Sequence, residues 1–211
     1  SNWNMPYINS WCRIRRNIIV ANGQTVWEEP GADVSVFLTN AYRRLDIGYP
    51  KFYKMDRLSQ LGFLAAEMLL HDRFDKQEYP AEAVAVVLAN AHSSLDTDLR
   101  YQQSMSVIPS PALFVYTLPN IVIGEICIRH QLKGENTFFV FEQYDIPFLN
   151  DYINQLLEQN NAQAVIGGWV DIFQDQYEAF LYLVEKKQIP GSIIHNQQTI
   201  SDLYGIVDAG S

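Results

Sequence analysis

The sequence predicts a single α/β domain with a mostly parallel five-stranded mixed sheet, helices on both faces of that sheet and a small N-terminal hairpin. Three observations carry this prediction. Wholly apolar runs alternate with runs of helical period along the chain. An Asn-Gly pair lies between two β-rich runs near the N-terminus. The 211 residues, 48% of them apolar, suffice for one core, and no linker or repeat divides residues 1–211.

The N-terminal quarter predicts a strand followed by a hairpin. Residues 7–14 alternate loosely between apolar and polar side chains. The β-rich runs 17–20 and 25–28 flank the Asn-Gly pair that begins at Asn22, which is the strongest short-range hairpin signal. Residues 34–42 have no clean period, so the sequence leaves open whether they form a short helix or a short strand.

The middle of the chain predicts a capped helix and a buried strand. Asp56 precedes an Ala- and Leu-rich run of helical period that extends to Leu70, which indicates an N-cap and a helix. Residues 83–89 are wholly apolar and rich in β-branched side chains, as is typical of a central strand covered on both faces.

A polar loop over residues 93–98 follows this strand and leads to a short helix predicted near 99–105. Its aspartates and the nearby His92 are residue types that bind metals. The alternative, which we prefer, is that these short side chains make local turn and cap hydrogen bonds. We therefore expect no metal site.

The second half of the chain continues the alternation. The predicted elements are a helix from Pro119 to Lys133-Gly134, an apolar strand at 137–141, a helix from Asp145 to about Gln159, strands at 164–170 and 177–185, and a short helix near 199–206. The glycines at 167 and 168 indicate a close backbone approach within their strand.

Composition excludes several classes of function. A net charge of −9 and a pI near 4.8 argue against nucleic acid and against an anionic membrane as partners, because both attract basic surfaces. The sequence has neither a long apolar run nor a signal-peptide pattern, so we expect a cytoplasmic protein. No motif indicates a cofactor.

The two cysteines, Cys12 and Cys127, have neither metal-binding nor disulfide spacing. Both lie in apolar runs, and we interpret them as buried structural residues. The alternative for Cys127 is a reactive thiol, because Arg129 and His130 follow it and a nearby cation lowers a thiol pKa.

Basic residues concentrate near the N-terminus, where eight of the fifteen lie within the first 57 positions. We interpret most of them as a solvated surface with weak local ion pairs. The alternative is a docking patch for an acidic partner.

Several motifs in order resemble the N-terminal half of a β-ketoacyl synthase of the thiolase-like fold, and the resemblance covers nearly the whole chain. They are Lys54-Met55-Asp56-Arg57 with its Ala-rich helix, Val84 to Ala89 with Ser93-Ser94, Pro119-Asn120 through Gly124 and Ile128, Lys133-Gly134, Gly167-Gly168, and Ala179 to Glu185. The family's members are 3-oxoacyl-[acyl-carrier-protein] synthases, which are acyltransferases.

The resemblance implies a missing nucleophile. The family holds its catalytic cysteine where the strand after the Lys-Gly turn meets the next helix, and the matching position here is Gln143, or Glu142 with one residue of error. The family's catalytic histidines belong to a C-terminal half that we expect this chain to lack. His71, His92, His130 and His195 fall in none of the matched motifs.

Three functions follow from this resemblance. The first is a noncatalytic accessory or partner subunit in fatty-acid, polyketide or polyene biosynthesis. In the thiolase-like fold the strand before the nucleophile pairs across a dimer, so strand 137–141 predicts a homodimer or a heterodimer with a ketosynthase. The second is an acyltransferase or malonyl decarboxylase that acts on carrier-protein thioesters through Gln143, Glu142 or Cys127. The third is an acyl-chain binding module.

The binding module would use an aromatic pocket formed by Phe138, Phe139, Phe141, Phe148 and Trp169, although residues at such spacing belong more often to a core. An acyl carrier protein is acidic, and it would dock on the basic N-terminal third if that region forms one face. The candidate docking residues are Arg43, Arg44, Lys51 and Lys54.

Overall fold

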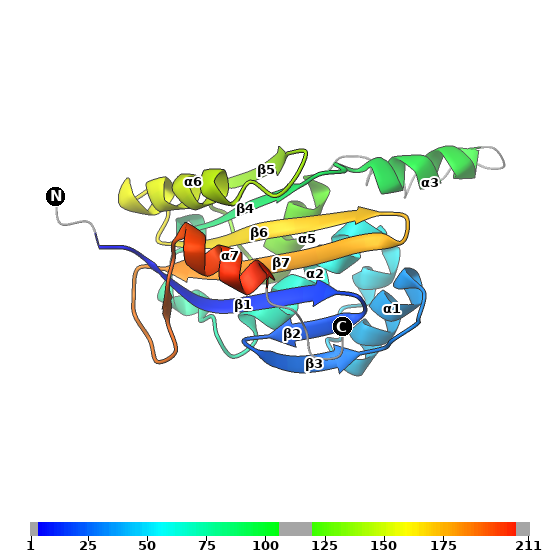
Figure 1. Cartoon of the computed structure of the whole chain (residues 1–211), viewed down its shortest axis with the longest axis horizontal. Helices are drawn as coiled ribbons and strands as arrows, with labels where there is room; N and C mark the ends of the chain where they lie inside the picture. Colours follow the sequence, from blue (N-terminus) through cyan, green and yellow to red (C-terminus); the bar gives the residue numbers. More distant parts are fainter. Residues whose placement is uncertain (1–3, 106–119, 206–211) are drawn as a thin grey trace.

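The structure, a computed structural model, describes residues 4–105 and 120–205. An eight-stranded sheet runs through these residues in the order β3-β2-β1-β7-β6-β4-β5, and β8 pairs with β1 (Figure 1). The strands are β1 (Tyr7–Arg15), β2 (Ile18–Ala21), β3 (Gln24–Glu28), β4 (Val84–Asn90), β5 (Asn136–Val140), β6 (Ala164–Phe173), β7 (Gln176–Glu185) and β8 (Ile193–Ile194).

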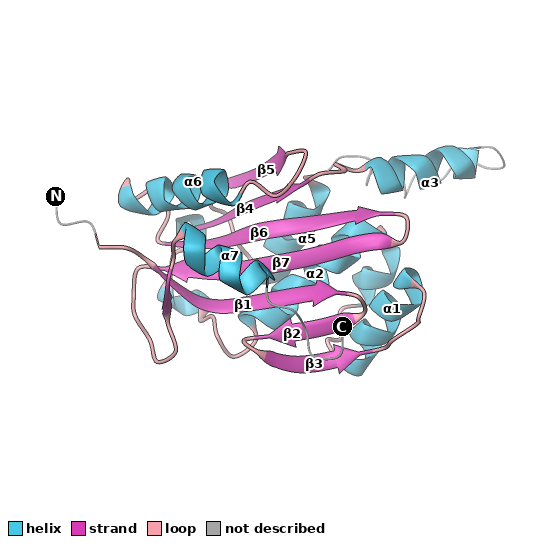
Figure 2. Cartoon of the chain, in the orientation of Figure 1, coloured by secondary structure: helices cyan, strands magenta, loops and turns pink. Residues whose placement is uncertain are grey.

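Helices cover both faces of the sheet (Figure 2). The α-helices are α1 (Val34–Arg44), α2 (Arg57–Leu70), α3 (Leu95–Met105), α5 (Ile121–His130), α6 (Ile146–Glu158) and α7 (Gln197–Gly205), and the short 3₁₀ helices are η1 (Pro50–Lys54), η2 (Lys76–Glu78) and η3 (Ala81–Ala83). Helices α1, α2 and α5 pack against one face and form the larger core. Helices α6 and α7 cover the other face with a smaller core. These layers confirm the predicted fold class.

The sheet differs from the prediction in its detail. Parallel pairing is confined to β4 with its neighbours β5 and β6, whereas β6, β7, β1, β2 and β3 pair antiparallel in turn. A tight turn joins β6 to β7, and such a turn can connect only antiparallel strands. Through β1 the hairpin is continuous with the main sheet, so the sheet has more strands than the five predicted.

Several helix boundaries depend on side chains that satisfy their ends. The predicted Asp56 cap is confirmed, because its carboxylate accepts from the Ser59 N–H at 3.0 Å. Residues 34–44 form helix α1, which Asp33 caps in the same way. Helix α3 begins at Leu95, before the predicted start near Leu99, because the Asp98 N–H already bonds to the Ser94 carbonyl at 2.8 Å.

Helix α5 ends earlier than predicted. Its last residue is His130, and Gln131 adopts the left-handed conformation that closes a helix. The predicted start of this helix at Pro119 lies outside the described residues. Strand β8 was not predicted, because two isoleucines in a mixed segment give no periodic signal.

Gly168 confirms the predicted close approach of two strands. A Cβ atom at this position would lie 2.0 Å from the Phe180 carbonyl oxygen of β7, and the residue has a φ of +144°. Any side chain would therefore push β6 away from β7 in the centre of the sheet.

Candidate functional site: the edge strand β5 and its elbow

Strand β5 is the last strand at one end of the sheet and pairs only with β4 among the described residues (Figure 1). The Glu135 carbonyl accepts from the Val86 N–H at 2.9 Å, and the Phe141 N–H donates to the Asn90 carbonyl at 2.9 Å. In a parallel ladder, alternate residues direct both backbone groups to the same neighbour. The odd-numbered residues of this segment therefore bond to β4, and Asn136, Phe138 and Val140 direct their backbone groups outward.

The odd-numbered side chains form an aromatic cluster with α6. The Phe139 ring lies 5.6 Å from Phe141, 5.1 Å from Phe148 and 5.2 Å from Tyr152, measured between ring centroids. We call Phe139, Phe141, Phe148 and Tyr152 the edge cluster. Phe138 is not part of it, because it points to the opposite face and packs against the core of α2 and α5. The structure thus brings together three of the four phenylalanines proposed as an acyl pocket.

The edge cluster and its strand remain partly open to solvent. Val140 is 51% exposed and Phe148 is 42% exposed. At the other end of β5, Glu135 accepts a hydrogen bond from the Tyr152 hydroxyl at 2.6 Å, and the Thr137 hydroxyl lies 3.4 Å from the same carboxylate oxygen. Burial and then this carboxylate raise the pKa of Tyr152. The exposed edge is therefore apolar toward its Val140 end and polar at its start, where Asn136 is exposed and the Glu135 carboxylate is held in place.

The elbow between β5 and α6 contains the two candidate nucleophile positions, Glu142 and Gln143. Both side chains are exposed, and they line an open depression of about 610 Å³ together with Val140, Phe141, Tyr144, Asp145 and Pro147. No residue from Phe141 to Tyr144 has a positive φ. The strand-to-helix connection over these four residues therefore contains no left-handed residue.

Residues of α6 and its cap already use or remove backbone donors at the N-terminus of this helix. The Asp145 carboxylate accepts from the Phe148 N–H at 3.0 Å, and Pro147 has no N–H to donate. A helix N-terminus that activates a thiol or binds an oxyanion needs free donors at this position. Tyr144 turns inward, where it stacks on Trp169 and its hydroxyl lies 3.1 Å from the Tyr182 hydroxyl. Trp169 thus lies apart from the edge cluster.

The cysteines are poor nucleophiles in this structure. Cys12 is fully buried, and burial raises the pKa of its thiol to about 12. Burial also raises the pKa of Cys127 to about 11, so this thiol is protonated at neutral pH. The neighbouring Arg129 does not offset this effect, because its guanidinium bonds to Glu67 at 2.6 Å.

The histidines do not gather at the elbow. His195 is fully buried, its Nδ1 lies 2.7 Å from the Asn154 side-chain oxygen, and burial lowers its pKa to about 3. His130 lies beside Glu67, and burial lowers its pKa. His71 is exposed.

The loop after β4 holds a polar cluster that sequence reasoning missed in part. His92 Nδ1 lies 2.9 Å from the Asp171 carboxylate of β6, which also accepts from the His92 N–H at 2.9 Å. Arg57 makes two hydrogen bonds to Asp96, at 2.7 and 3.2 Å, and Asp56 accepts from Thr97. These contacts are long-range. The predicted local turn and cap bonds are separate ones: the Ser93 N–H donates to the Asn90 side-chain oxygen at 2.8 Å, and the Ser94 hydroxyl donates to the Asp98 carboxylate at 3.3 Å. Asp171 itself gave no signal, because it is 79 residues away from His92 in the chain.

The basic residues of the N-terminal third do not form one face. Arg13 and Arg15 donate to the carbonyls of Leu203 and Tyr204 in α7, on the side of the sheet opposite α1. The four candidate docking residues lie on or near α1 and η1. Arg43 lies over the Tyr53 ring, Arg44 over the Trp27 ring, and Lys51 lies 3.2 Å from the Glu125 carboxylate. Lys54 is exposed.

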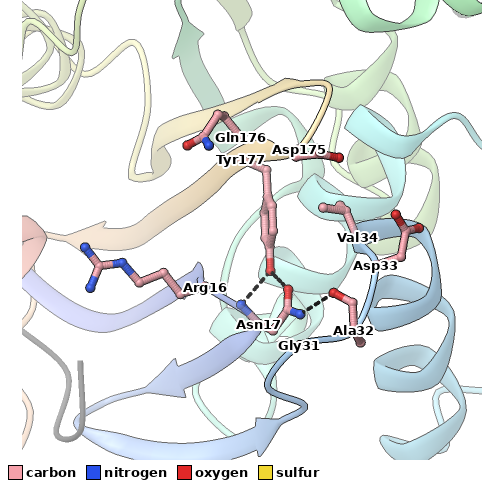
Figure 3. Close-up of a pocket in the computed structure, with 9 residues that line it drawn as sticks. All are labelled: Arg16, Asn17, Gly31, Ala32, Asp33, Val34, Asp175, Gln176 and Tyr177. Carbon is pink, nitrogen blue, oxygen red and sulfur yellow. Dashed lines mark hydrogen bonds between the residues drawn. The ribbon is translucent and has the colours of Figure 1, made fainter.

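A second open depression, of about 690 Å³, lies where the β1–β2 and β6–β7 turns meet the start of α1 (Figure 3). The polar groups at its base bond to one another. The Tyr177 hydroxyl donates to the Asn17 side-chain oxygen at 2.6 Å, and the Asn17 amide donates to the Ala32 carbonyl at 2.7 Å. These bonds hold the two turns and the start of α1 together, so we interpret this depression as a structural junction.

In the described part of the chain, no helix is both long enough and apolar enough to cross a membrane.

Known structures resemble this chain in fold. A chain of the ishigamide ketosynthase/chain length factor matches with a TM-score of 0.65 and 20% identity, over 86% of this chain and 62% of that chain. A chain from the structure of the ketosynthase ApeO in complex with its chain length factor ApeC from Xenorhabdus doucetiae matches with a TM-score of 0.56 and 12% identity, over 88% and 80%. A chain of AntDE:AntF, a type II PKS acyl-carrier protein in complex with its ketosynthase, matches with a TM-score of 0.61 and 13% identity, over 88% and 63%.

The chain thus spans less than two thirds of the ishigamide and AntDE:AntF chains. No protein-family model and no curated protein sequence matches it. Identities this low establish the architecture and not the activity. The chain adopts the thiolase-like fold of ketosynthases.

Proposed function

We propose that this chain is a noncatalytic, ketosynthase-like partner subunit that pairs with a ketosynthase through the edge strand β5, as a chain length factor does in an assembly that makes polyketide or polyene chains. The observation that carries the proposal is the edge itself. Strand β5 ends the sheet with outward backbone groups at Asn136, Phe138 and Val140 and with an exposed apolar side chain at Val140. Soluble proteins rarely leave such an edge unprotected unless another strand covers it.

The elbow supports the noncatalytic part of the proposal. Gln143 cannot form a thioester, and its side chain is exposed to solvent. The Asp145 cap occupies the Phe148 N–H and Pro147 has no N–H, so the start of α6 has two fewer donors with which to stabilise an oxyanion. Two of the similar structures contain a ketosynthase together with a chain length factor. This similarity of fold supports the same kind of partner here.

Co-purification with a ketosynthase tests the proposal. The chain should be co-expressed with the ketosynthase encoded nearest to it, and the complex isolated through a tag on the ketosynthase. Val140→Lys places a charge on the edge and should abolish co-purification. Val36→Lys is the matched control, because Val36 is 49% exposed on α1 at a distance from β5. Retention of the Val140→Lys variant would contradict the proposal.

The enzymatic alternative is an acyl transfer or malonyl decarboxylation carried out by this chain alone. It receives less support, because the thiol of Cys127 has a raised pKa and the elbow offers no nucleophile. Incubation with malonyl-loaded and acyl-loaded carrier protein separates the two functions. Turnover or a covalent adduct formed by the isolated chain would favour the enzyme, whereas the partner subunit should show neither.

The aromatic edge cluster favours one addition to the partner-subunit proposal. Phe141 lines the open depression at the elbow, and its ring centroid lies 5.4 Å from that of Phe148 in the same cluster. A partner strand on β5 would cover this depression and enclose its aromatic side beside Phe141. We infer that the edge cluster contacts the growing acyl chain in the assembled complex.

A further inference from the structure

We propose that Glu135 makes the β5 edge selective against a second copy of this chain and in favour of a foreign strand that carries a lysine or an arginine opposite Glu135. This inference rests on the proposed function, because it concerns the partner of the same edge. It starts from the one charged side chain on the face of β5 that carries the edge cluster.

The position of the Glu135 charge is fixed. Its Oε1 atom accepts from the Tyr152 hydroxyl at 2.6 Å and lies 3.4 Å from the Thr137 hydroxyl, so the carboxylate stands at the rim of the edge cluster. The Glu135 carbonyl bonds to β4, which keeps this residue in line with the strand. A strand added to β5 would therefore pass directly beside the carboxylate.

Symmetry then determines what a second copy would place there. Two copies of β5 that pair about a two-fold axis run antiparallel, and residue i faces a residue of the same parity. For pairing centred on Phe138, the middle residue of β5, Glu135 faces Phe141 of the second copy and Asn136 faces Val140. Each carboxylate would thus lose solvent against an aromatic side chain with no cation opposite it, and the cost of desolvating that charge opposes association.

Two further charges act in the same direction. Glu142 is exposed at the other end of the strand, so antiparallel self-pairing brings the Glu142 end of one copy beside the Glu135 end of the other. Each copy also carries a net charge of −9. Like charges placed across paired strands destabilise the pair.

A foreign strand removes this penalty if its chemistry differs at one position. An antiparallel strand with a lysine or arginine opposite Glu135 would form an ion pair at the rim. Apolar side chains opposite Phe139 and Phe141 would bury the rest of the edge cluster. The edge therefore fits a strand that is basic at its end and apolar in its middle, which the β5 segment of this chain is not.

Sedimentation velocity on the full chain tests the inference with three variants. The wild type should stay monomeric across micromolar concentrations. Glu135→Gln keeps an acceptor for Tyr152 but removes the charge, and it should tighten self-association about tenfold or more. Phe141→Lys places a cation opposite Glu135 in both halves of the two-fold pair and should form a homodimer.

Phe141→Glu is the matched control for Phe141→Lys. It removes the same ring and adds the opposite charge, so it should stay monomeric, and circular dichroism of both variants checks that they fold. Self-association of the wild type would overturn the inference. Equal sedimentation of Phe141→Lys and Phe141→Glu, together with no effect of Glu135→Gln, would overturn it as well.

The outcomes also separate this inference from the proposed function. If Glu135→Gln self-associates but the wild type does not co-purify with a ketosynthase, the selectivity of the edge stands and the proposed function fails. If the wild type co-purifies and the three variants behave alike, the proposed function stands and the role of Glu135 is lost.

Discussion

The two ends of the sheet are built differently. At one end, three of the five side chains of β3 are polar, and its register with β2 is irregular between Ile19 and Val20. Its tryptophan, Trp27, lies beneath the Arg44 guanidinium. At the other end, β5 pairs with β4 without a register shift, and its last three side chains, those of Phe138, Phe139 and Val140, are aromatic or aliphatic. Irregular pairing and polar or charged side chains prevent an edge strand from pairing with a strand of another chain. Among the described residues, the β5 end therefore has less such protection than the β3 end, and its charge comes from Glu135.

The largest effect should come from removing a backbone donor on one edge. Val140→Pro keeps the site apolar but removes an N–H that points away from β4, and it should weaken pairing with the ketosynthase about a hundredfold. Isothermal titration calorimetry on the purified proteins would measure this loss. Val26→Pro, at the irregular position of β3, is the control and should leave the affinity unchanged. Equal losses from the two variants would mean that the two edges do not differ in function.

The second largest effect should be on the free energy of unfolding at acidic pH, which depends on neither edge of the sheet. His195 is fully buried with a pKa lowered to about 3 from an ordinary value of 6.5. The folded state thus binds this proton more weakly than the unfolded state. The contribution of His195 to the free energy of unfolding should be fully present above pH 6.5. It should fall by about 1.4 kcal/mol per pH unit as the pH drops toward 3.

Urea unfolding between pH 7 and pH 4.5 would measure this slope. His195→Asn keeps a donor for Asn154 and removes the titration, so its slope should be shallower than that of the wild type. His71→Asn removes an exposed histidine and is the control, with a slope equal to that of the wild type. Parallel slopes for all three proteins would refute the role of His195.

A smaller effect is expected at the β3 end, where the candidate carrier-docking residues lie. Arg43→Glu with Arg44→Glu should weaken the binding of an acidic acyl carrier protein about tenfold, and more at low salt. Fluorescence anisotropy with a labelled carrier would measure the affinity. The double variant Arg73→Glu with Lys133→Glu changes the net charge equally at two other exposed residues and should bind as the wild type does. Equal losses of affinity in both double variants would mean that the net charge, and not this patch, determines carrier binding.

The smallest effect should come from the cap of α6. Asp145→Ala removes the acceptor of the Phe148 N–H and should cost about 1 kcal/mol of unfolding free energy. Asp33→Ala removes the equivalent cap of α1, near the β3 end, and should cost a similar amount. Only the Asp145 variant should also weaken pairing, because α6 supports the edge cluster. A loss of pairing in the Asp33 variant would contradict this distinction.

Much of the fold could be predicted from local signals. The Asp56 cap predicts the start of α2, and the apolar run of β4 predicts a strand covered on both faces. The strand before Gln143 was predicted to be an edge strand, and it is one. These features follow from residues close together in the chain. The mostly antiparallel pairing of the sheet was less accessible, because strand direction depends on tight turns such as the one around Gln174, which adopts a positive φ.

The candidate site was harder to predict, because its contacts join distant residues. Strand alternation alone would have separated Phe138 from Phe139 and Phe141, yet the three were grouped as one pocket. The bond between Glu135 and Tyr152 spans 17 residues across a loop, and that between His92 and Asp171 spans 79. The basic residues of the N-terminal third are near in sequence, but the sheet separates Arg13 from Arg43.

Residue-resolved hydrogen exchange on β5 tests the central claim most directly. In the free chain, the amides of Phe139 and Phe141 should be protected by β4, and those of Phe138 and Val140 should exchange rapidly. In complex with the ketosynthase, Phe138 and Val140 should become protected, while the amides of β3 should not change. Rapid exchange of Phe138 and Val140 within a complex that has formed would contradict the pairing of β5 with the partner.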